Sequence, residues 1–395
     1  MEKNSLIFAF LPQANIEAKY QWLKFQPEPE PMMFDPGFPG VDPIPINFDM
    51  PDKSRTLTIS VVQPITPLWS VAFGYKAAEA GHDIFKMQKE LAVEQIKLEV
   101  ITLYYNYQML SESMVVLAQT KEQLQRYKEQ AENFVAAGLA DRRAILKIEI
   151  EQAKIEQQIQ MVESNTGLIK KNLSLLMNVP KEDFELEQVR VSNEVLKASH
   201  DELEDLMISN RLELKIVDRS LDVTENQKML AAQPFIPTLA IAGGYSKTWD
   251  ASQFQPEGTL FIGGVLSWDI GFNWLKAAFD VKKAEHEHTK AIFESVDVKK
   301  MLGLQLLQLE NDIETKSQAI EIANKEVASA TENLRIEEDK YKEKLTTETE
   351  LLDASIALRA AKMNLLNSLW EHRVALHRLA ATIGVTYKDI VGGGM

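Results

Sequence analysis

Two stretches of the chain, QAENFVAAGLADRRAILKI (residues 130–148) and IEEDKYKEKLTTETELLDA (residues 336–354), occupy equivalent places in a repeat. Residues 130–178 align with residues 336–384 without a gap, at an offset of 206. The aligned pairs include Leu146 with Leu352, Leu173 with Leu379, and Asn178 with Gly384. Self-similarity at one offset over half a chain indicates two copies of one supersecondary unit. The chain is therefore a tandem duplication.

The alignment extends upstream and locates one insertion. Tyr20 aligns with Tyr245 at an offset of 225, whereas Pro64 aligns with Asp269 at an offset of 205. An insertion of 20 residues in the first copy accounts for the difference. Residues 26–53 hold eight of the fifteen prolines, a composition that excludes a helix or the interior of a sheet. These residues are therefore predicted to form the inserted loop.

Composition and charge exclude several classes of function. The 395 residues carry a formal net charge of −15 and no Lys/Arg-rich run, so a nucleic acid partner is not expected. The absence of cysteine excludes disulfides and thiolate metal sites. His286 and His288 are two residues apart on an expected helix and point to different faces, so no metal or other cofactor is expected. No apolar run is long enough for a membrane-spanning helix, but a β-barrel is not excluded.

Four segments alternate apolar and polar residues with a period of two. This pattern predicts strands at about residues 13–24, 54–66, 237–247 and 258–271. One face of each strand is apolar. The residues of these apolar faces are Ile16, Tyr20, Leu57, Ile59, Val61, Leu239, Ile241, Leu260, Ile262, Leu266 and Trp268.

Most of the remaining chain is predicted to be helical. A heptad seam of apolar residues marks long helices at residues 74–137 and 273–342. After a brief break, each is followed by a second helix, at 140–178 and 347–384. A further helix at 201–231 precedes the second strand pair. Each copy is thus predicted to be a strand pair that leads into a long antiparallel helical hairpin, in a fold that is mainly α with a small β part.

The duplication divides the chain into a first repeat, residues 1–180, and a second repeat, residues 181–395, which ends in a short C-terminal tail. The first repeat has no counterpart of the helix at 201–231. We therefore expect such a helix upstream of Met1, behind a signal peptide that is missing from this sequence. The protein is accordingly expected to be exported.

The strand pairs allow two interpretations. Strands with one apolar face are most often part of a soluble sandwich. However, five of the six tryptophans lie in or beside the strands, as in the aromatic girdles of membrane barrels. Four strands per chain also leave two open edges. A symmetric ring of chains removes these edges by joining the strands into one transmembrane barrel with a polar lumen.

The hairpin tips carry a recognisable motif. The second tip, YKEKLTTETELLDA (residues 341–354), places a tyrosine, an acidic residue, a pair of leucines and Asp-Ala in sequence. The first tip has a glycine, Gly138, and the hairpins end in LMNVP (176–180) and TIG (382–384). With this motif, its duplication and its strand placement, nearly the whole chain resembles the outer membrane efflux protein family, the TolC-like channel-tunnels.

The resemblance implies a homotrimer. In such proteins twelve strands, four from each chain, form one β-barrel in the outer membrane of a Gram-negative-type bacterium, in contact with its lipid. The helices continue as a hollow α-barrel across the periplasm. Members are passive exit ducts for small molecules, metals or proteins in tripartite efflux or type I secretion. A periplasmic adaptor (membrane fusion protein) joins them to an inner-membrane pump of the RND, ABC or a similar class.

Glu350 and Asp353 match the family residues that ring the periplasmic entrance. Carboxylates three residues apart share a helix face, and three chains would place six of them in a constriction. Such a ring favours cations, and crowding within it raises each pKa. The alternative is that two acidic residues near a helix N-terminus only complement the helix dipole.

The tips also depart from the family pattern. Lys344 stands where the family has a glycine, so the turn must avoid a left-handed conformation or adopt it at a cost. Thr346 replaces a basic residue that ties the closed tip to its neighbour. The charges of such a lock are expected to be reversed, with Arg142 or Arg143 reaching toward Glu348 or Glu350. The residues expected at the tips, as gate lock or adaptor contacts, are Gly138, Leu139, Arg142, Arg143, Tyr341, Lys344, Leu345 and Thr346.

Two other classes of protein remain as alternatives. A periplasmic adaptor carries one long hairpin between compact β domains, whereas this chain has two hairpins, each preceded by strands. A soluble coiled-coil scaffold accounts for the heptads but not for the tryptophans around the strands. An enzyme has the least support, because the sequence contains no phosphate loop and no triad order.

Overall fold

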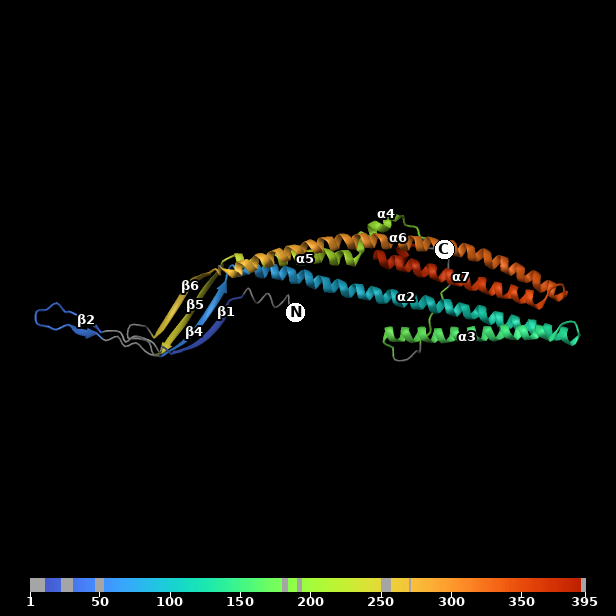
Figure 1. The fold of residues 1–395 in the computed structure, drawn as a ribbon, viewed down its shortest axis with the longest axis horizontal. Helices are drawn as coiled ribbons and strands as arrows, with labels where there is room; N and C mark the ends of the chain where they lie inside the picture. Colours follow the sequence, from blue (N-terminus) through green and yellow to red (C-terminus); the bar gives the residue numbers. More distant parts are fainter. Residues whose placement is uncertain are drawn as a thin grey trace. The chain divides into compact units, whose positions relative to one another are not determined.

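The computed structural model describes residues 11–22, 31–46, 53–179, 184–189, 194–249, 257–269 and 271–391. The expected strand ends at residues 23–24 and 270, and the loop residues 26–30 and 47–52, lie outside the described residues. The chain forms two compact units, one from residues 1–86 and 216–295 and the other from 87–215 and 296–395. The fold is mostly helical with a small sheet part, as predicted (Figure 1).

The first unit contains a four-stranded antiparallel sheet. Its order is β1 (Gln13–Trp22), β4 (Lys53–Pro64), β5 (Thr238–Trp249) and β6 (Gly258–Ser267) (Figure 1). The strands lie where the alternation predicts them, with shifted ends: β5 continues to Trp249, and β6 ends at Ser267 instead of residue 271. The chain leaves the sheet after β6 because Phe272 already begins the next helix, α6.

The inserted loop contains a short ribbon of its own. β2 (Met32–Phe34) and β3 (Ile44–Ile46) form a separate two-stranded antiparallel sheet. Met33 pairs with Pro45 in this ribbon. A proline cannot donate a ladder hydrogen bond, but it is tolerated in an edge strand, so the high proline content and the ribbon are compatible.

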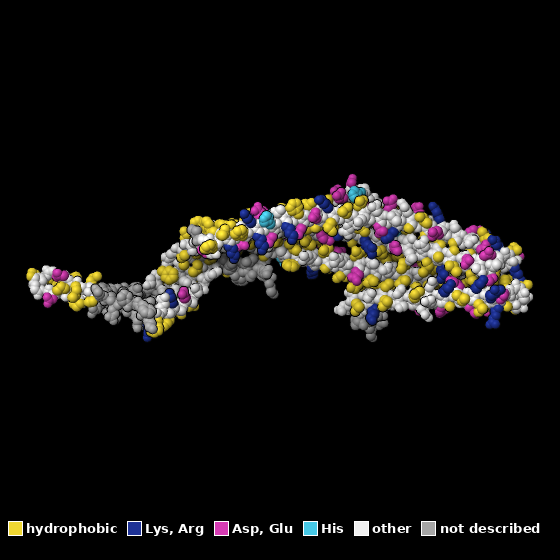
Figure 2. Space-filling view, viewed as in Figure 1, with side chains coloured by type: hydrophobic (Ala, Val, Ile, Leu, Met, Phe, Trp, Pro, Cys, Tyr) yellow, Lys and Arg dark blue, Asp and Glu magenta, His cyan; other side chains and the backbone are white. Residues whose placement is uncertain are grey.

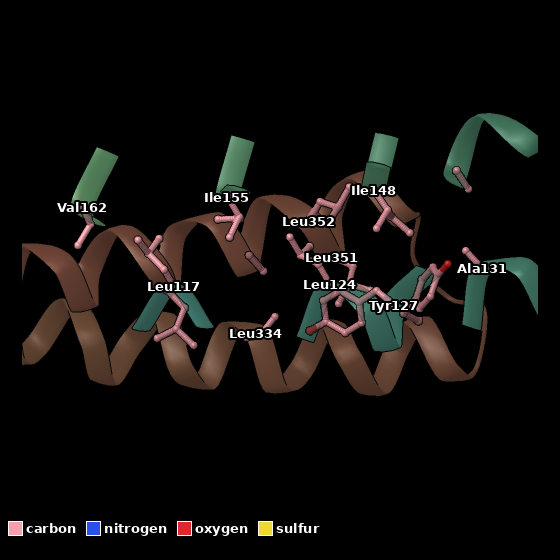
Figure 3. Packing of buried hydrophobic residues seen from close by; sticks show 14 residues of the cluster. Leu117, Leu124, Tyr127, Ala131, Ile148, Ile155, Val162, Leu334, Leu351 and Leu352 are labelled. Carbon is pink, nitrogen blue, oxygen red and sulfur yellow. The ribbon is translucent and has the colours of Figure 1, made fainter. Parts of the chain in front are cut away.

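Four long helices form two hairpins. α2 (Pro67–Ala136) pairs with α3 (Arg142–Met177), and α6 (Phe272–Lys342) pairs with α7 (Glu348–Ile383). In the second unit, apolar side chains from all four helices form one cluster toward the hairpin tips (Figure 3). Its fully buried members include Leu117, Leu124, Ile148, Ile155 and Leu351. No helix among the described residues is long and apolar enough to cross a membrane.

The segment predicted as one helix at residues 201–231 is two helices. α4 (His200–Asn210) and α5 (Leu212–Ala231) are separated at Arg211, which has an extended conformation (φ −62°, ψ 121°). The Arg211 side chain donates to the carbonyl oxygen of Ala381 at 3.0 Å and pairs with Glu213 at 2.8 Å. The tail after α7 forms a helical turn, α8 (Tyr387–Ile390), and packs in the same core as α4.

Four helix ends share one capping geometry. Each ends in a left-handed residue followed by a residue whose N–H bonds to a carbonyl five positions back, the Schellman motif. The left-handed residues are Gly138 (φ 71°), Asn178 (φ 54°), Lys344 (φ 59°) and Gly384 (φ 73°). They form two pairs that are each 206 residues apart, so the repeat in the sequence is reproduced in the backbone.

Candidate functional sites

The sheet has one apolar and one polar face, and its register identifies both. Ile16 is opposite Ile59, Ile59 is opposite Tyr245, and Tyr245 is opposite Leu260, so these four side chains share a face. The same register places all the predicted apolar-face residues within the strands on that face, namely Ile16, Tyr20, Leu57, Ile59, Val61, Leu239, Ile241, Leu260, Ile262 and Leu266. Trp268 lies just beyond the end of β6.

Among the described residues, no segment covers the apolar face. Leu260 is 83% exposed, Ile262 85% and Leu266 69%. The opposite face is polar, and its hydroxyls pair across the strands: Thr58 Oγ1 lies 3.1 Å from Ser246 Oγ. An apolar surface of this extent marks an interaction site in a soluble protein or a lipid contact in a membrane protein.

At the second tip, Glu350 is part of a capping box at the start of α7. Thr347 N donates to the Glu350 carboxylate at 3.1 Å, and Glu350 N donates to Thr347 Oγ1. The hydroxyl of Thr346 also donates to this carboxylate. The hydrogen bonds that the carboxylate accepts, first from Thr346 and then from Thr347, lower the pKa of Glu350. Within one chain Glu350 therefore caps the start of α7, a role at the helix N-terminus that is compatible with the dipole alternative stated above.

A shallow hollow of about 410 Å³ lies beside this cap. Asp353 and Glu337 line it together with Lys340. Glu337 accepts from Lys340 at 2.8 Å, and it lies 2.8 Å from Thr346 Oγ1, whose one hydroxyl proton it shares with Glu350. These contacts lower the pKa of Glu337. The hollow is thus lined by three carboxylates and one ammonium group, and Asp353 is not used by the cap.

The first tip presents a different set of charges. Asp141 caps α3 by accepting from Arg143 N at 2.9 Å, and its carboxylate also pairs with the Arg143 side chain at 3.0 Å. The expected contact of Arg143 with Glu348 or Glu350 is therefore not formed within the chain. Lys147 takes that place, bonding Glu348 at 3.0 Å and Thr349 at 2.7 Å.

Leu139 and Leu345 occupy equivalent positions after the left-handed residues and are exposed (59% and 77%). Tyr341, expected among the tip contacts, is instead only 5% exposed and packs against Phe134 with a centroid distance of 5.6 Å. Burial raises the pKa of its phenol. Tyr341 is thus a core residue, because the last turn of α6 still faces the hairpin interior.

Lys344 adopts the left-handed conformation that the family glycine would permit without strain. Its ammonium lies 4.6 Å from the centroid of the Phe134 ring, a cation–π distance. This contact compensates part of the backbone strain. Phe134 and Lys147 are tip residues that the sequence did not single out. Their roles arise from contacts between hairpins, and no local motif marks them.

A comparison with protein families decides the assignment of the second repeat. Residues 203–385 match the model of the outer membrane efflux protein family. This part of the chain belongs to that family. The resemblance noted in the tip motif is thereby confirmed. No curated protein sequence matches the chain significantly.

Solved outer-membrane channels share the fold over nearly the whole chain. CusC, in crystal structures that follow its folding and transmembrane channel formation, superposes with a TM-score of 0.80 at 13% identity, over 97% of this chain and 86% of that one. VceC of Vibrio cholerae superposes with a TM-score of 0.74 at 15% identity, over 98% of this chain and 90% of VceC. The open outer membrane channel MtrE of Neisseria gonorrhoeae superposes with a TM-score of 0.75 at 15% identity, over 98% of this chain and 84% of MtrE.

Proposed function

We propose that the protein is the outer-membrane channel subunit of a tripartite efflux or type I secretion system. It acts as a passive exit duct, with its sheet in the outer membrane and its helices in the periplasm. The observation that carries this proposal is the sheet, whose exposed apolar face and polar opposite face match the lipid side and lumen side of a membrane barrel. The family match of residues 203–385 supports it.

Barrel closure requires further copies of the chain. β1 and β6 are the two edges of the sheet, and an unpaired edge in lipid leaves backbone groups without hydrogen bonds. The four strands alternate in direction, so β6 of one copy can pair antiparallel with β1 of the next. A homotrimer then closes a barrel of twelve strands, an even number as in bacterial outer-membrane barrels.

The hairpin tips are the proposed docking site for a periplasmic adaptor, which links the duct to an inner-membrane pump. Leu139 and Leu345 are exposed apolar residues at equivalent places in the two repeats. In a trimer they form a ring of six, each flanked by charged residues of α3 or α7. Exposed apolar anchors with a polar surround are typical of protein interfaces.

The acidic residues of the second tip are proposed to make the periplasmic entrance prefer cations. Asp353 is the better candidate, because Glu350 is held by its capping hydrogen bonds. In planar bilayers with a KCl gradient, Asp353→Asn is expected to reduce the cation preference seen in the reversal potential. Asp353→Glu keeps the charge and is the control. An unchanged reversal potential in Asp353→Asn would remove this residue from the entrance.

The barrel itself is testable by crosslinking, because the chain contains no cysteine. Thr259→Cys on β6 is combined in turn with Asn15→Cys, Glu17→Cys or Lys19→Cys on β1. All four positions are on the polar face. Oxidation of membrane fractions is expected to give covalent trimers for at least one pair. The single variant Thr259→Cys is not expected to form covalent trimers. Full-length protein that stays soluble and monomeric would instead support a coiled-coil scaffold.

A further inference from the structure

The junction between β6 and α6 combines a cavity with an exposed apolar stripe. The cavity has a volume of about 610 Å³ and is lined by residues from the ends of the sheet and the first turns of α6, including Trp268, Asn273, Lys276 and Asp280. The first turns of α6 also carry Phe272, Leu275 and Phe279, which are 92%, 59% and 64% exposed. Figure 2 shows hydrophobic side chains gathered where α6 begins.

The stripe continues the apolar face of the sheet. Phe272, Leu275 and Phe279 have the spacing i, i+3, i+7 and so lie along one side of the helix. In the sequence they come a few residues after Leu266, the last apolar-face residue of β6, and Trp268, which lies just beyond the strand. A lipid surface that covers the sheet would therefore also cover the start of α6.

Cationic residues end the stripe on the same side of the helix. Lys282 and Lys283 follow Phe279 by three and four residues, the spacing of neighbours on one face. Lys283 lies 3.8 Å from Glu287, whereas Lys282 forms no ion pair among the described residues. Apolar residues followed by lysines form the usual pattern where a helix passes from hydrocarbon to phosphate groups.

Charges of both signs border the cavity. Lys276 is four residues after Phe272, so it lies between the apolar stripe and the cavity lining. It has no ion-pair partner in the described part of the chain, and Asp280 lines the cavity one turn further on. An ammonium and a carboxylate at this spacing suit a zwitterionic headgroup, with its phosphate at Lys276 and its own ammonium at Asp280.

Aromatic rings complete the junction. Trp268 and Trp274 have ring centroids 5.3 Å apart, and Phe235 lies 5.8 Å from Trp274. The indole N–H of Trp274 is buried and has no acceptor among the described residues. Tryptophan prefers membrane interfaces, where its ring is in apolar surroundings and its N–H meets polar groups.

We propose that this junction binds a phospholipid, phosphatidylethanolamine, from the leaflet on the side of the helices. The headgroup occupies the cavity at Lys276 and Asp280, and an acyl chain lies along Phe272, Leu275 and Phe279. The proposal rests on the outer-membrane location given above. It extends the lipid contact from the sheet to the first two turns of α6.

Spin labels test the stripe. Single cysteines are introduced at Leu275, Phe279, Phe293 or Ile262 of the full chain, labelled, and reconstituted into phosphatidylethanolamine and phosphatidylglycerol vesicles. Labels at 275 and 279 are expected to favour oxygen over a water-soluble nickel chelate. Phe293 is the matched control, since it lies on the same face two heptads further, about 21 Å beyond Phe279, and is 66% exposed. Its label is expected to favour the nickel chelate.

The outcomes separate this proposal from the proposed function. Nickel access at 275 and 279 with oxygen access at 262 would overturn the phospholipid site and leave the barrel intact. Nickel access at 262 as well would reject the barrel. Labels at 275 and 279 that are hidden from both reagents and show dipolar broadening would mean that a second copy covers the stripe, which also overturns the proposal.

Lys276 tests the headgroup. Phosphatidylethanolamine is titrated into the purified full chain in detergent and its retention is measured by native mass spectrometry. Lys276→Ala is expected to weaken retention about fivefold, the effect of about 1 kcal/mol for one lysine near lipid phosphate. Lys325→Ala, an exposed lysine far along the same helix, is expected to behave as the wild type. Equal retention by the two variants would overturn the headgroup site.

Discussion

Arg359→Met is expected to destabilise the contact between the two hairpins by about 3 kcal/mol, because it leaves Glu151 buried without its main partner. Glu151 of α3 and Arg359 of α7 are joined at 3.0 Å, and their side chains are only 6% and 12% exposed. Arg359 also donates to Gln158 at 2.6 Å. Breaking a buried ion pair costs about 3 to 5 kcal/mol. The lower value is expected here, because Lys154 still contacts Glu151 at 3.0 Å.

Hydrogen exchange of the full chain in detergent measures this effect locally. The free energy of opening of amides in α3 and α7 near the pair is compared between variants. The double variant Glu151→Leu, Arg359→Met is expected within about 1 kcal/mol of the wild type, because apolar replacements of a buried pair are nearly neutral. Lys121→Met, which breaks an exposed pair with Glu156, is the control. If Arg359→Met changes the opening free energy no more than this control, the reasoning is refuted.

Three further predictions concern the helix ends and one half-buried histidine. Gly138→Ala is expected to destabilise the first tip by about 1 kcal/mol, because alanine must adopt the left-handed conformation of Gly138. Lys344→Gly is expected to change the stability by less than about 0.5 kcal/mol, since relief of backbone strain offsets the lost cation–π contact. Thermal unfolding of both variants and the wild type measures these differences. The pKa of Glu350 is lowered in the folded chain. Its contribution to stability is therefore fully present above the pKa of the unfolded chain and is lost as the pH falls through the lower pKa of the folded chain. Glu350→Gln should remove this contribution from the pH dependence of the unfolding free energy. Burial lowers the pKa of His377 to about 4, so the unfolded chain binds more protons than the folded chain between about pH 6.5 and 4. The free energy of unfolding should therefore decrease as the pH is lowered through that window, and His377→Gln should make it depend less on pH.

The sequence was sufficient for the sheet because a period of two fixes which residues share a face. Ile16, Ile59 and Leu260 were assigned to one face from alternation alone, and the register places them in one band with Tyr245. The break between α4 and α5 could not be predicted. Arginine favours helix, and the extended conformation of Arg211 depends in part on a contact with a residue distant in sequence, Ala381.

The tip was predicted less completely than the fold. The spacing of Glu350 after Thr347 is a capping box, a signal present in the sequence, and the structure uses Glu350 in that way. The position of Tyr341 carries no such signal. Its burial depends on the angle at which α6 meets Phe134 of the other hairpin, which no spacing within one helix determines.

The two tips have equal backbones but opposite electrostatics at the next helix. α7 begins with Glu348 and Glu350 in its first turn, which complements the positive end of the helix dipole. α3 begins with Arg142 and Arg143 and has no acidic residue in its first turn, so the dipole opposes them. Asp141 offsets only one of these charges, through its pair with Arg143. A helix start that retains two unfavourable charges after duplication is better explained by an acidic partner outside the chain than by stability. For the proposed channel, the arginines are therefore better candidates than the cap for contacts of the first tip with a neighbouring subunit or an adaptor.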